Sequence, residues 1–255
     1  DKVLFRRTHP LYGLAGSISA SIDGVFFVID FAFGITRAYK VIFSGGNPVQ
    51  AKCISTFSIG SRPISSISGY DWICASASSN RLALWEIITG TVHRLIDFDS
   101  LITALSFNES GYYIWVAVSN KIEIVGVNGN ILSEKVIEDD VITAITHINR
   151  THNAFCGTKK GKLFMLHFDL ASGEINLKEL NSLHSNPIEK IIVQRTIRQY
   201  LTLDSTGMIE KYDNDGNLIN GESPIFTACA ICTNPTHELC QFCNKPICKK
   251  CRCRG

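Results

Sequence analysis

The feature that most constrains this sequence is a unit of four short strands that recurs with a spacing of about 40 residues. The clearest copy runs from about Ile64 to Leu95 and contains, in order, the runs PISSIS, DWICASAS, RLALWEI and TVHRLI. These runs are rich in β-branched and aromatic residues, and Gly, Asn, Asp and Ser separate them, which is typical of strands joined by turns. No stretch from Ser17 to about Ile219 has convincing helical periodicity, so we predict an all-β fold.

Four other copies align with this one. Three of them begin at about Ile102, Val141 and Pro187, and a first, less regular copy spans about Ser17 to Phe43. A four-stranded repeat of this length is the unit of a propeller blade, and each blade can bury its two apolar faces only against neighbouring blades. We therefore predict a β-propeller over residues 1–225, with about five recognisable blades.

One copy carries a more specific signature. Trp85-Glu86 closes its third run, at the place where WD repeats carry Trp-Asp, and on this pattern the region resembles a WD-repeat propeller. Asn80 and Asn120 occupy the turn in which many WD repeats have aspartate, so we expect the buried polar network of that family to be degenerate here. Five copies are fewer than the common seven, and the chain opens at Asp1 without a methionine. We therefore expect the blades to belong to a larger ring, or the ring to be completed by something else.

The end of the chain has a different composition, because seven of the ten cysteines fall between Cys229 and Cys253. Their spacing, C-x2-C-x7-C-x2-C-x4-C-x2-C, forms three CxxC pairs: Cys229/Cys232, Cys240/Cys243 and Cys248/Cys251. A CxxC turn presents two thiolates to one metal ion, and structural zinc takes four such ligands. The β region has almost no disulfide framework, which favours a reducing, cytoplasmic environment and metal binding over disulfides. We predict a small zinc finger over residues 226–255 that folds around its metal.

Three families of zinc module resemble this segment. The stretch CQFCNKPICKKC is similar to the middle of a FYVE finger, the three pairs to a B-box, and the series that begins at His237 to the second half of a RING. The cross-brace of these families implies one complete site made by Cys229, Cys232, Cys248 and Cys251. Cys240 and Cys243 would then need two more ligands, for which His237 and Cys253 are the nearby candidates. We expect one zinc ion, and a second if these two residues complete its site.

The departures from these families limit the function. Where a FYVE finger has a basic, histidine-rich motif, Thr236 to Gln241 has one histidine, an acid and no arginine, so specific phosphoinositide capture is not expected. If the segment is aligned with a RING, the position of the third zinc ligand falls at Pro235, whose side chain cannot bind a metal. The basic residues of the tail still predict weak, salt-sensitive contact with anionic membranes: Lys245, Lys249, Lys250, Arg252 and Arg254. Specific nucleic-acid binding is not expected, because Phe242 is the one aromatic residue from Cys229 to Gly255 that could stack on a base.

A degenerate WD-repeat propeller followed by a FYVE-like or B-box-like finger resembles the C-terminal part of BEACH-domain proteins, which are large scaffolds in vesicle trafficking and autophagy. Blade copies such as KIEIVGVNGNI and KLFMLHFDL carry this resemblance. It implies a non-enzymatic scaffold that binds other proteins through the propeller surface, in the cytoplasm or at the periphery of endomembranes, without a small-molecule substrate. The alternative is a zinc-dependent, RING-like ubiquitin ligase with a propeller that binds its substrate.

The remaining motifs are interpreted as structural. Cys53, Cys74 and Cys156 lie singly in apolar runs and are expected to behave as small hydrophobic residues. Gly157 to Lys162 superficially suggests a phosphate loop but has one residue too few between its glycines, so we expect a hairpin turn. Histidines without metal-ligand spacing are expected to be partly exposed in the sheets: His9, His93, His147, His152, His167 and His184.

Overall fold

The computed structural model describes residues 14–21, 23–68, 72–194 and 199–222, and the short pairs 227–228 and 235–236. Five four-stranded antiparallel sheets and one two-stranded sheet make up the secondary structure of these residues. They contain no helix, and thus none long and apolar enough to cross a membrane. The predicted all-β fold is confirmed for the described part of the chain.

Each four-stranded sheet is one blade, in which consecutive strands pair with one another. Blade 1 has β1 (Ala15–Ala20), β2 (Phe26–Phe31), β3 (Ile35–Ser44) and β4 (Asn47–Ser58). Blade 2 has β5 (Ile64–Ile67), β6 (Ile73–Ser78), β7 (Arg81–Glu86) and β8 (Val92–Asp97). Blade 3 has β9 (Ile102–Phe107), β10 (Tyr113–Val118), β11 (Lys121–Gly126) and β12 (Ile131–Val136). Blade 4 has β13 (Ile142–His147), β14 (Asn153–Thr158), β15 (Leu163–Asp169) and β16 (Glu174–Leu180). Blade 5 has β17 (Ile188–Gln194), β18 (Gln199–Asp204), β19 (Ile209–Tyr212) and β20 (Leu218–Glu222).

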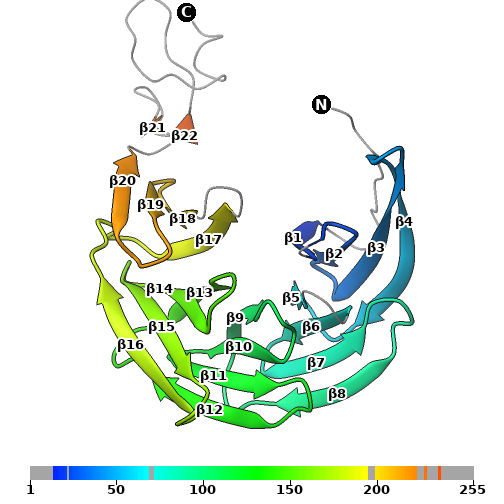
Figure 1. The fold of residues 1–255 in the computed structure, drawn as a ribbon, viewed down its shortest axis with the longest axis horizontal. Helices are drawn as coiled ribbons and strands as arrows, with labels where there is room; N and C mark the ends of the chain where they lie inside the picture. The colour runs from blue at the N-terminus through cyan, green and yellow to red at the C-terminus, as the bar shows by residue number, and fades with distance from the viewer. Residues whose placement is uncertain are drawn as a thin grey trace, which may run out of the picture.

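The blades follow one another around an arc, with the first strand of each on the inside and the fourth on the outside (Figure 1). The inner strands β1, β5, β9, β13 and β17 contact one another in that order. Figure 1 shows the arc open between blade 1 and blade 5, and the described residues place no further sheet there. Blade 1 is larger than the predicted Ser17–Phe43 copy, because a hairpin at Gly45-Gly46, both with positive φ, leads into β4.

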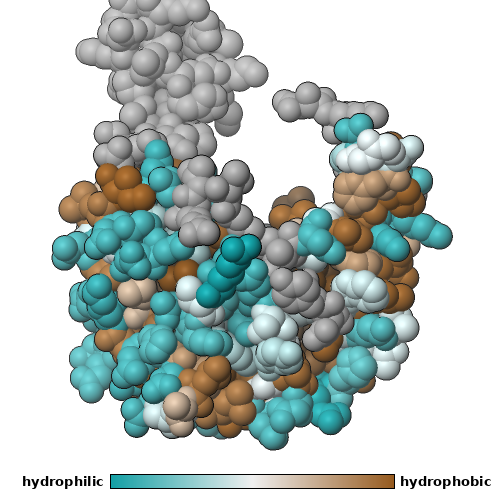
Figure 2. Space-filling view, in the orientation of Figure 1, coloured by the Kyte–Doolittle hydropathy of each residue, from teal (hydrophilic) through white to brown (hydrophobic). Residues whose placement is uncertain are grey.

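The position of a strand in its blade decides whether its side chains are buried or exposed. Every residue of β10 (YIWVAV) is buried, because a middle strand has a neighbouring blade on each face. The outer strand β12 (ILSEKV) is almost entirely exposed. Figure 2 accordingly shows polar side chains over most of the visible face and apolar ones gathered towards the rim.

Four apolar clusters lie between successive blades and form the core. Between blades 3 and 4, Trp115 and Leu166 are fully buried, and the ring of Phe168 meets Tyr113 edge-on at 5.3 Å between centroids. Between blades 1 and 2, Trp85 stacks on Phe57 at 5.1 Å. The core is thus shared between sheets, as the repeat predicts.

The two-stranded sheet pairs β21 (Thr227–Ala228) with β22 (Pro235–Thr236), within the segment predicted to be a zinc finger. The remainder of residues 226–255 lies outside the described residues.

We expect Leu166→Ala to lower the free energy of unfolding by about 2–5 kcal/mol, because it leaves a cavity between blades 3 and 4. Leu166 is 0% exposed, whereas Leu95, on the outer strand β8, is 59% exposed. The matched change Leu95→Ala should cost less than about 0.5 kcal/mol. Urea unfolding followed by circular dichroism measures both, and equal losses in the two variants would contradict the shared core.

Candidate functional site

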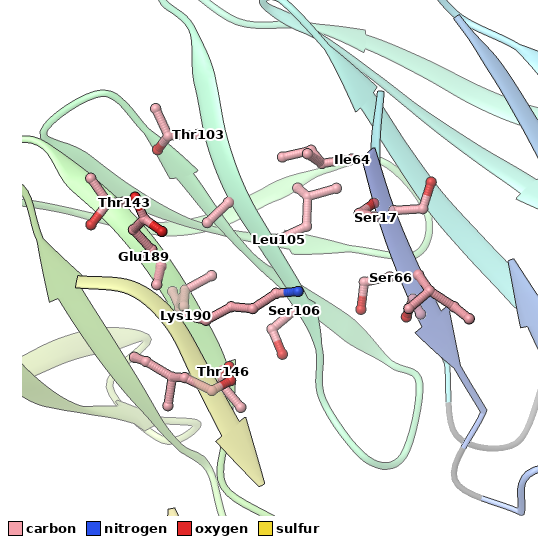
Figure 3. Close-up of a pocket in the computed structure, with 17 residues that line it drawn as sticks. Ser17, Ile64, Ser66, Thr103, Leu105, Ser106, Thr143, Thr146, Glu189 and Lys190 are labelled. Atoms are coloured by element: carbon pink, nitrogen blue, oxygen red, sulfur yellow. Dashed lines mark hydrogen bonds between the residues drawn. The ribbon is translucent and has the colours of Figure 1, made fainter. Parts of the chain in front are cut away.

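The inner strands of the five blades surround a central cavity of about 330 Å³ (Figure 3). Small hydroxyl side chains dominate its lining because the strands converge there and leave little room. They come from all blades except the fifth: Ser17, Ser19, Ser65, Ser66, Thr103, Ser106, Thr143 and Thr146. Glu189 and Lys190, from β17, are the charged residues of this lining.

Several of these hydroxyls join neighbouring inner strands. Thr143 Oγ1 donates to the carbonyl of Ile188 at 2.6 Å, and Thr146 Oγ1 donates to the carbonyl of Ile191 at 2.9 Å, which ties blade 4 to blade 5. Ser65 Oγ lies 2.7 Å from Asp30 Oδ1, which ties blade 2 to blade 1. These hydroxyls serve the fold and are not free for a ligand.

Ser66 and Ser106, by contrast, accept hydrogen bonds from the backbone of the next blade. Ser66 Oγ accepts the backbone N–H of Phe107 at 3.1 Å, and Ser106 Oγ accepts that of His147 at 2.9 Å. Because each oxygen is an acceptor in these bonds, its own O–H remains available to donate into the cavity. The cavity therefore has a side that presents hydrogen-bond donors.

Lys190 adds a positive charge to that side. Figure 3 shows its side chain extending towards Ser106, whereas the carboxylate of Glu189 lies beside Thr143. Within the described residues Lys190 has no ion-pair partner. One ammonium and two hydroxyl donors converging on a cavity match a carboxylate or another group rich in acceptors.

A second polar cluster is buried in blade 5 around His184. Its Nδ1 lies 3.2 Å from Asp204 Oδ2, and its Nε2 lies 2.8 Å from Thr202 Oγ1 and 3.2 Å from Glu210 Oε2. Tyr212 donates its hydroxyl to Glu210 at 2.6 Å. Burial raises the pKa of Asp204, but hydrogen bonds from Thr206, Met208 and His184 outweigh it and hold that pKa below its ordinary value. The cluster is closed to ligands because its members satisfy one another.

A third polar cluster joins blades 1 and 2. Asp30 accepts hydrogen bonds from Ser17, Thr36 and Ser65, and burial raises the pKa of its carboxyl against the lowering effect of these bonds. Through Ser65 the cluster reaches Ser76, whose Oγ accepts the indole N–H of Trp85 at 2.9 Å. The Trp85 signature is therefore part of a polar tie between blades.

The structure corrects two predictions about polar residues. A degenerate buried network was expected from Asn80 and Asn120, and these do donate to backbone carbonyls at the ends of their own blades. Blade 5 nevertheless has a complete network around His184, which Asp204, the last residue of β18, could have revealed. His147 and His184 were predicted to be partly exposed but are buried. The ring of His184 lies against Thr202 and Asp204 of β18 and Glu210 of β19.

Other predictions have mixed outcomes. Cys74 and Cys156 are buried as expected, and burial raises the pKa of both thiols, whereas Cys53 is half-buried. Gly161 lies in the expected hairpin turn between β14 and β15, with a φ of 83°. Within the described residues no group of three metal-ligating side chains is placed to hold a metal. The predicted zinc ligands all lie outside the described residues: Cys229, Cys232, His237, Cys240, Cys243, Cys248, Cys251 and Cys253.

His184→Ala should lower the free energy of unfolding by about 3–5 kcal/mol, because it leaves two buried carboxylates without their common partner. His93→Ala, on the exposed outer strand β8, is the control and should be nearly neutral. Urea unfolding measures the loss, and hydrogen exchange should locate it in blade 5. A loss no larger than that of the control would show that the cluster does not stabilise the blade.

No protein-family model and no curated protein matches the sequence. Solved structures match the fold. Sqt1 from Chaetomium thermophilum, crystallised bound to the N-terminus of the ribosomal protein L10, superposes with a TM-score of 0.63 and 16% identity over 78% of this chain and 59% of its own. The chain therefore spans less than two thirds of Sqt1. The β-propeller domain of Cps50 (Swd1) from Myceliophteria thermophila superposes with a TM-score of 0.65 and 14% identity, over 85% of this chain and 76% of its own. The described part of this chain therefore has the fold of a WD40-like β-propeller with five blades.

Proposed function

We propose that this chain is a non-enzymatic protein-interaction scaffold whose central cavity captures an acidic group of a partner protein. The observation that carries the proposal is the convergence of the Lys190 ammonium, which has no ion-pair partner in the described part of the chain, with the hydroxyls of Ser66 and Ser106, both of which keep a proton to donate. A cavity of about 330 Å³ admits a side chain or a short stretch of chain.

The comparison with Sqt1 supports this proposal by analogy. In that structure a propeller of the same fold is bound to the N-terminus of another protein, the ribosomal protein L10. Folds of this kind host many functions, so the weight of the proposal rests on the cavity of this chain.

We also propose that residues 226–255 bind zinc through the complete set Cys229, Cys232, Cys248 and Cys251, with Cys240 and Cys243 in a second site. The support is the spacing of three CxxC pairs. The resemblance to the C-terminal part of BEACH-domain proteins supports a role in membrane trafficking, in the cytoplasm or beside endomembranes, with weak membrane contact through the basic tail. The RING-like ubiquitin ligase remains the alternative, and it requires His237 in a complete second site.

The cavity is tested with peptides selected from a random display library by the whole protein. Selected peptides should be enriched in Asp and Glu, and Lys190→Met should weaken their binding about tenfold or more, because one charge-assisted hydrogen bond is lost. Calorimetry or fluorescence anisotropy measures the affinity.

Lys178→Met is the matched control, because Lys178 is exposed on the outer strand β16, away from the cavity. Its affinity for the same peptides should equal that of the wild type. Equal losses in both variants would indicate a non-specific effect of net charge, and unchanged binding by Lys190→Met would rule out the cavity as the site.

The purified, reduced protein should contain one or two zinc ions, measured by elemental analysis. Cys248→Ser should remove about one of them, whereas Cys74→Ser, in the buried core of blades 1 and 2, should remove none. Chelation should leave the β-sheet circular dichroism largely intact, since the propeller has its own core. Less than half an equivalent of metal would contradict the finger.

A further inference from the structure

One face of blade 5 is not packed against another described blade. The residues of β18 alternate strictly between partly exposed and buried. The buried Tyr200 belongs to the apolar cluster shared with blade 4, so the alternate residues, which include Leu201 and Leu203, face the other way. Because blade 5 is an end blade of the arc, this face is turned towards the opening between blades 5 and 1 (Figure 1), where the described residues place no sheet.

The register of the sheet extends this face over three strands. Leu201 lies opposite Ile192 of β17, and Leu203 lies between Lys190 of β17 and Ile209 of β19. Ile192 is 46% exposed, and Ile209 is partly exposed. Four apolar residues of this face belong to none of the buried clusters between blades, and we call them the blade-5 patch: Ile192, Leu201, Leu203 and Ile209.

Lys190 connects the blade-5 patch with the central cavity. It lies two residues before Ile192, on the same face of β17, and its side chain extends into the cavity towards Ser106 (Figure 3). Residues two apart in a strand are separated by roughly 6.5 Å. A ligand whose acidic group reaches the Lys190 ammonium therefore lies beside the apolar patch.

Charge decides which kind of occupant fits this face. Its cation is Lys190, because the carboxylate of the neighbouring Glu189 lies beside Thr143 instead. A second copy of the same face, packed on this one about a two-fold axis, would bring two lysines of like charge into one contact. A segment that carries a carboxylate and an apolar side chain, by contrast, complements both the ammonium and the patch.

We propose that the segment captured by the central cavity carries a large apolar side chain beside its acidic residue, and that this side chain packs on the blade-5 patch. Side chains two residues apart in an extended segment lie on one face at about the spacing of Lys190 and Ile192, so one short stretch reaches both. Packing of the apolar side chain removes apolar surface of both partners from water. The inference rests on the proposed function, since it specifies what accompanies the acidic group held at Lys190.

The test is a double-mutant cycle between Ile192 and the apolar residue of the ligand. The probe is the tightest Lys190-dependent peptide from the display selection, with each of its apolar residues replaced in turn by alanine. With the wild-type protein, one such replacement should weaken binding about tenfold, because an apolar contact is lost. With Ile192→Thr, which keeps a β-branched side chain in the strand, the same replacement should cost less than about threefold.

Ile131→Thr is the matched control, because Ile131 is 53% exposed on the outer strand β12 of blade 3. It should bind every peptide as the wild type does. Both substitutions are at exposed positions and should leave the urea midpoint close to that of the wild type. If Ile192→Thr does not fold, Ile192→Ala replaces it.

The possible failures of the two proposals are distinguishable. Binding that depends on Lys190 but shows no coupling between Ile192 and an apolar residue of the peptide overturns the patch and leaves the central site standing. Sedimentation that finds a wild-type dimer, dissociated by Ile192→Thr, would show that a second copy covers the patch and would also overturn the inference. Selection that yields no Lys190-dependent peptide overturns both proposals.

Discussion

The structure depends on one constraint, which is that the sheet of a blade has two apolar faces and can bury them only against other sheets. The middle strand β10 therefore consists entirely of buried residues, and the core is divided among the gaps between blades. Exposed side chains belong instead to turns, to outer strands such as β12 and to the lining of the central cavity. The candidate sites lie in the cavity and on the open face of an end blade because the packed faces leave no room for them.

Convergence of the inner strands has a second consequence. Near the centre of the arc only small side chains fit, and small polar side chains there can reach the backbone of the next blade, as Thr143 and Thr146 do. The hydroxyl side chains around the centre therefore serve mainly to join one blade to the next. What marks a candidate binding site is the set of groups that this bonding leaves over: the ammonium of Lys190 and the hydroxyl protons of Ser66 and Ser106.

The sequence predicts the blades well because their signal is local. Apolar runs and turn residues within about 40 residues define each sheet, and only the long hairpin of blade 1 escapes this pattern. The polar clusters are harder to predict. His184 meets Thr202 and Asp204 at separations of 18 and 20 residues, and Ser106 of blade 3 accepts the backbone N–H of His147 across a separation of 41 residues. The cysteine spacing of the tail is again a local signal, and its zinc site stays a prediction.

The polar clusters are distributed in a way that follows from the shape of the arc. Blades 1 and 5 each have one neighbouring blade among the described residues, whereas blades 2 to 4 have two. The Asp30 cluster belongs to blade 1 and its contact with blade 2, and the His184 cluster belongs to blade 5. A blade with one apolar face buried gains less from the hydrophobic effect, so hydrogen bonds inside the blade matter more for its order. Groups that are satisfied inside an end blade therefore stabilise that blade and are not available to a ligand.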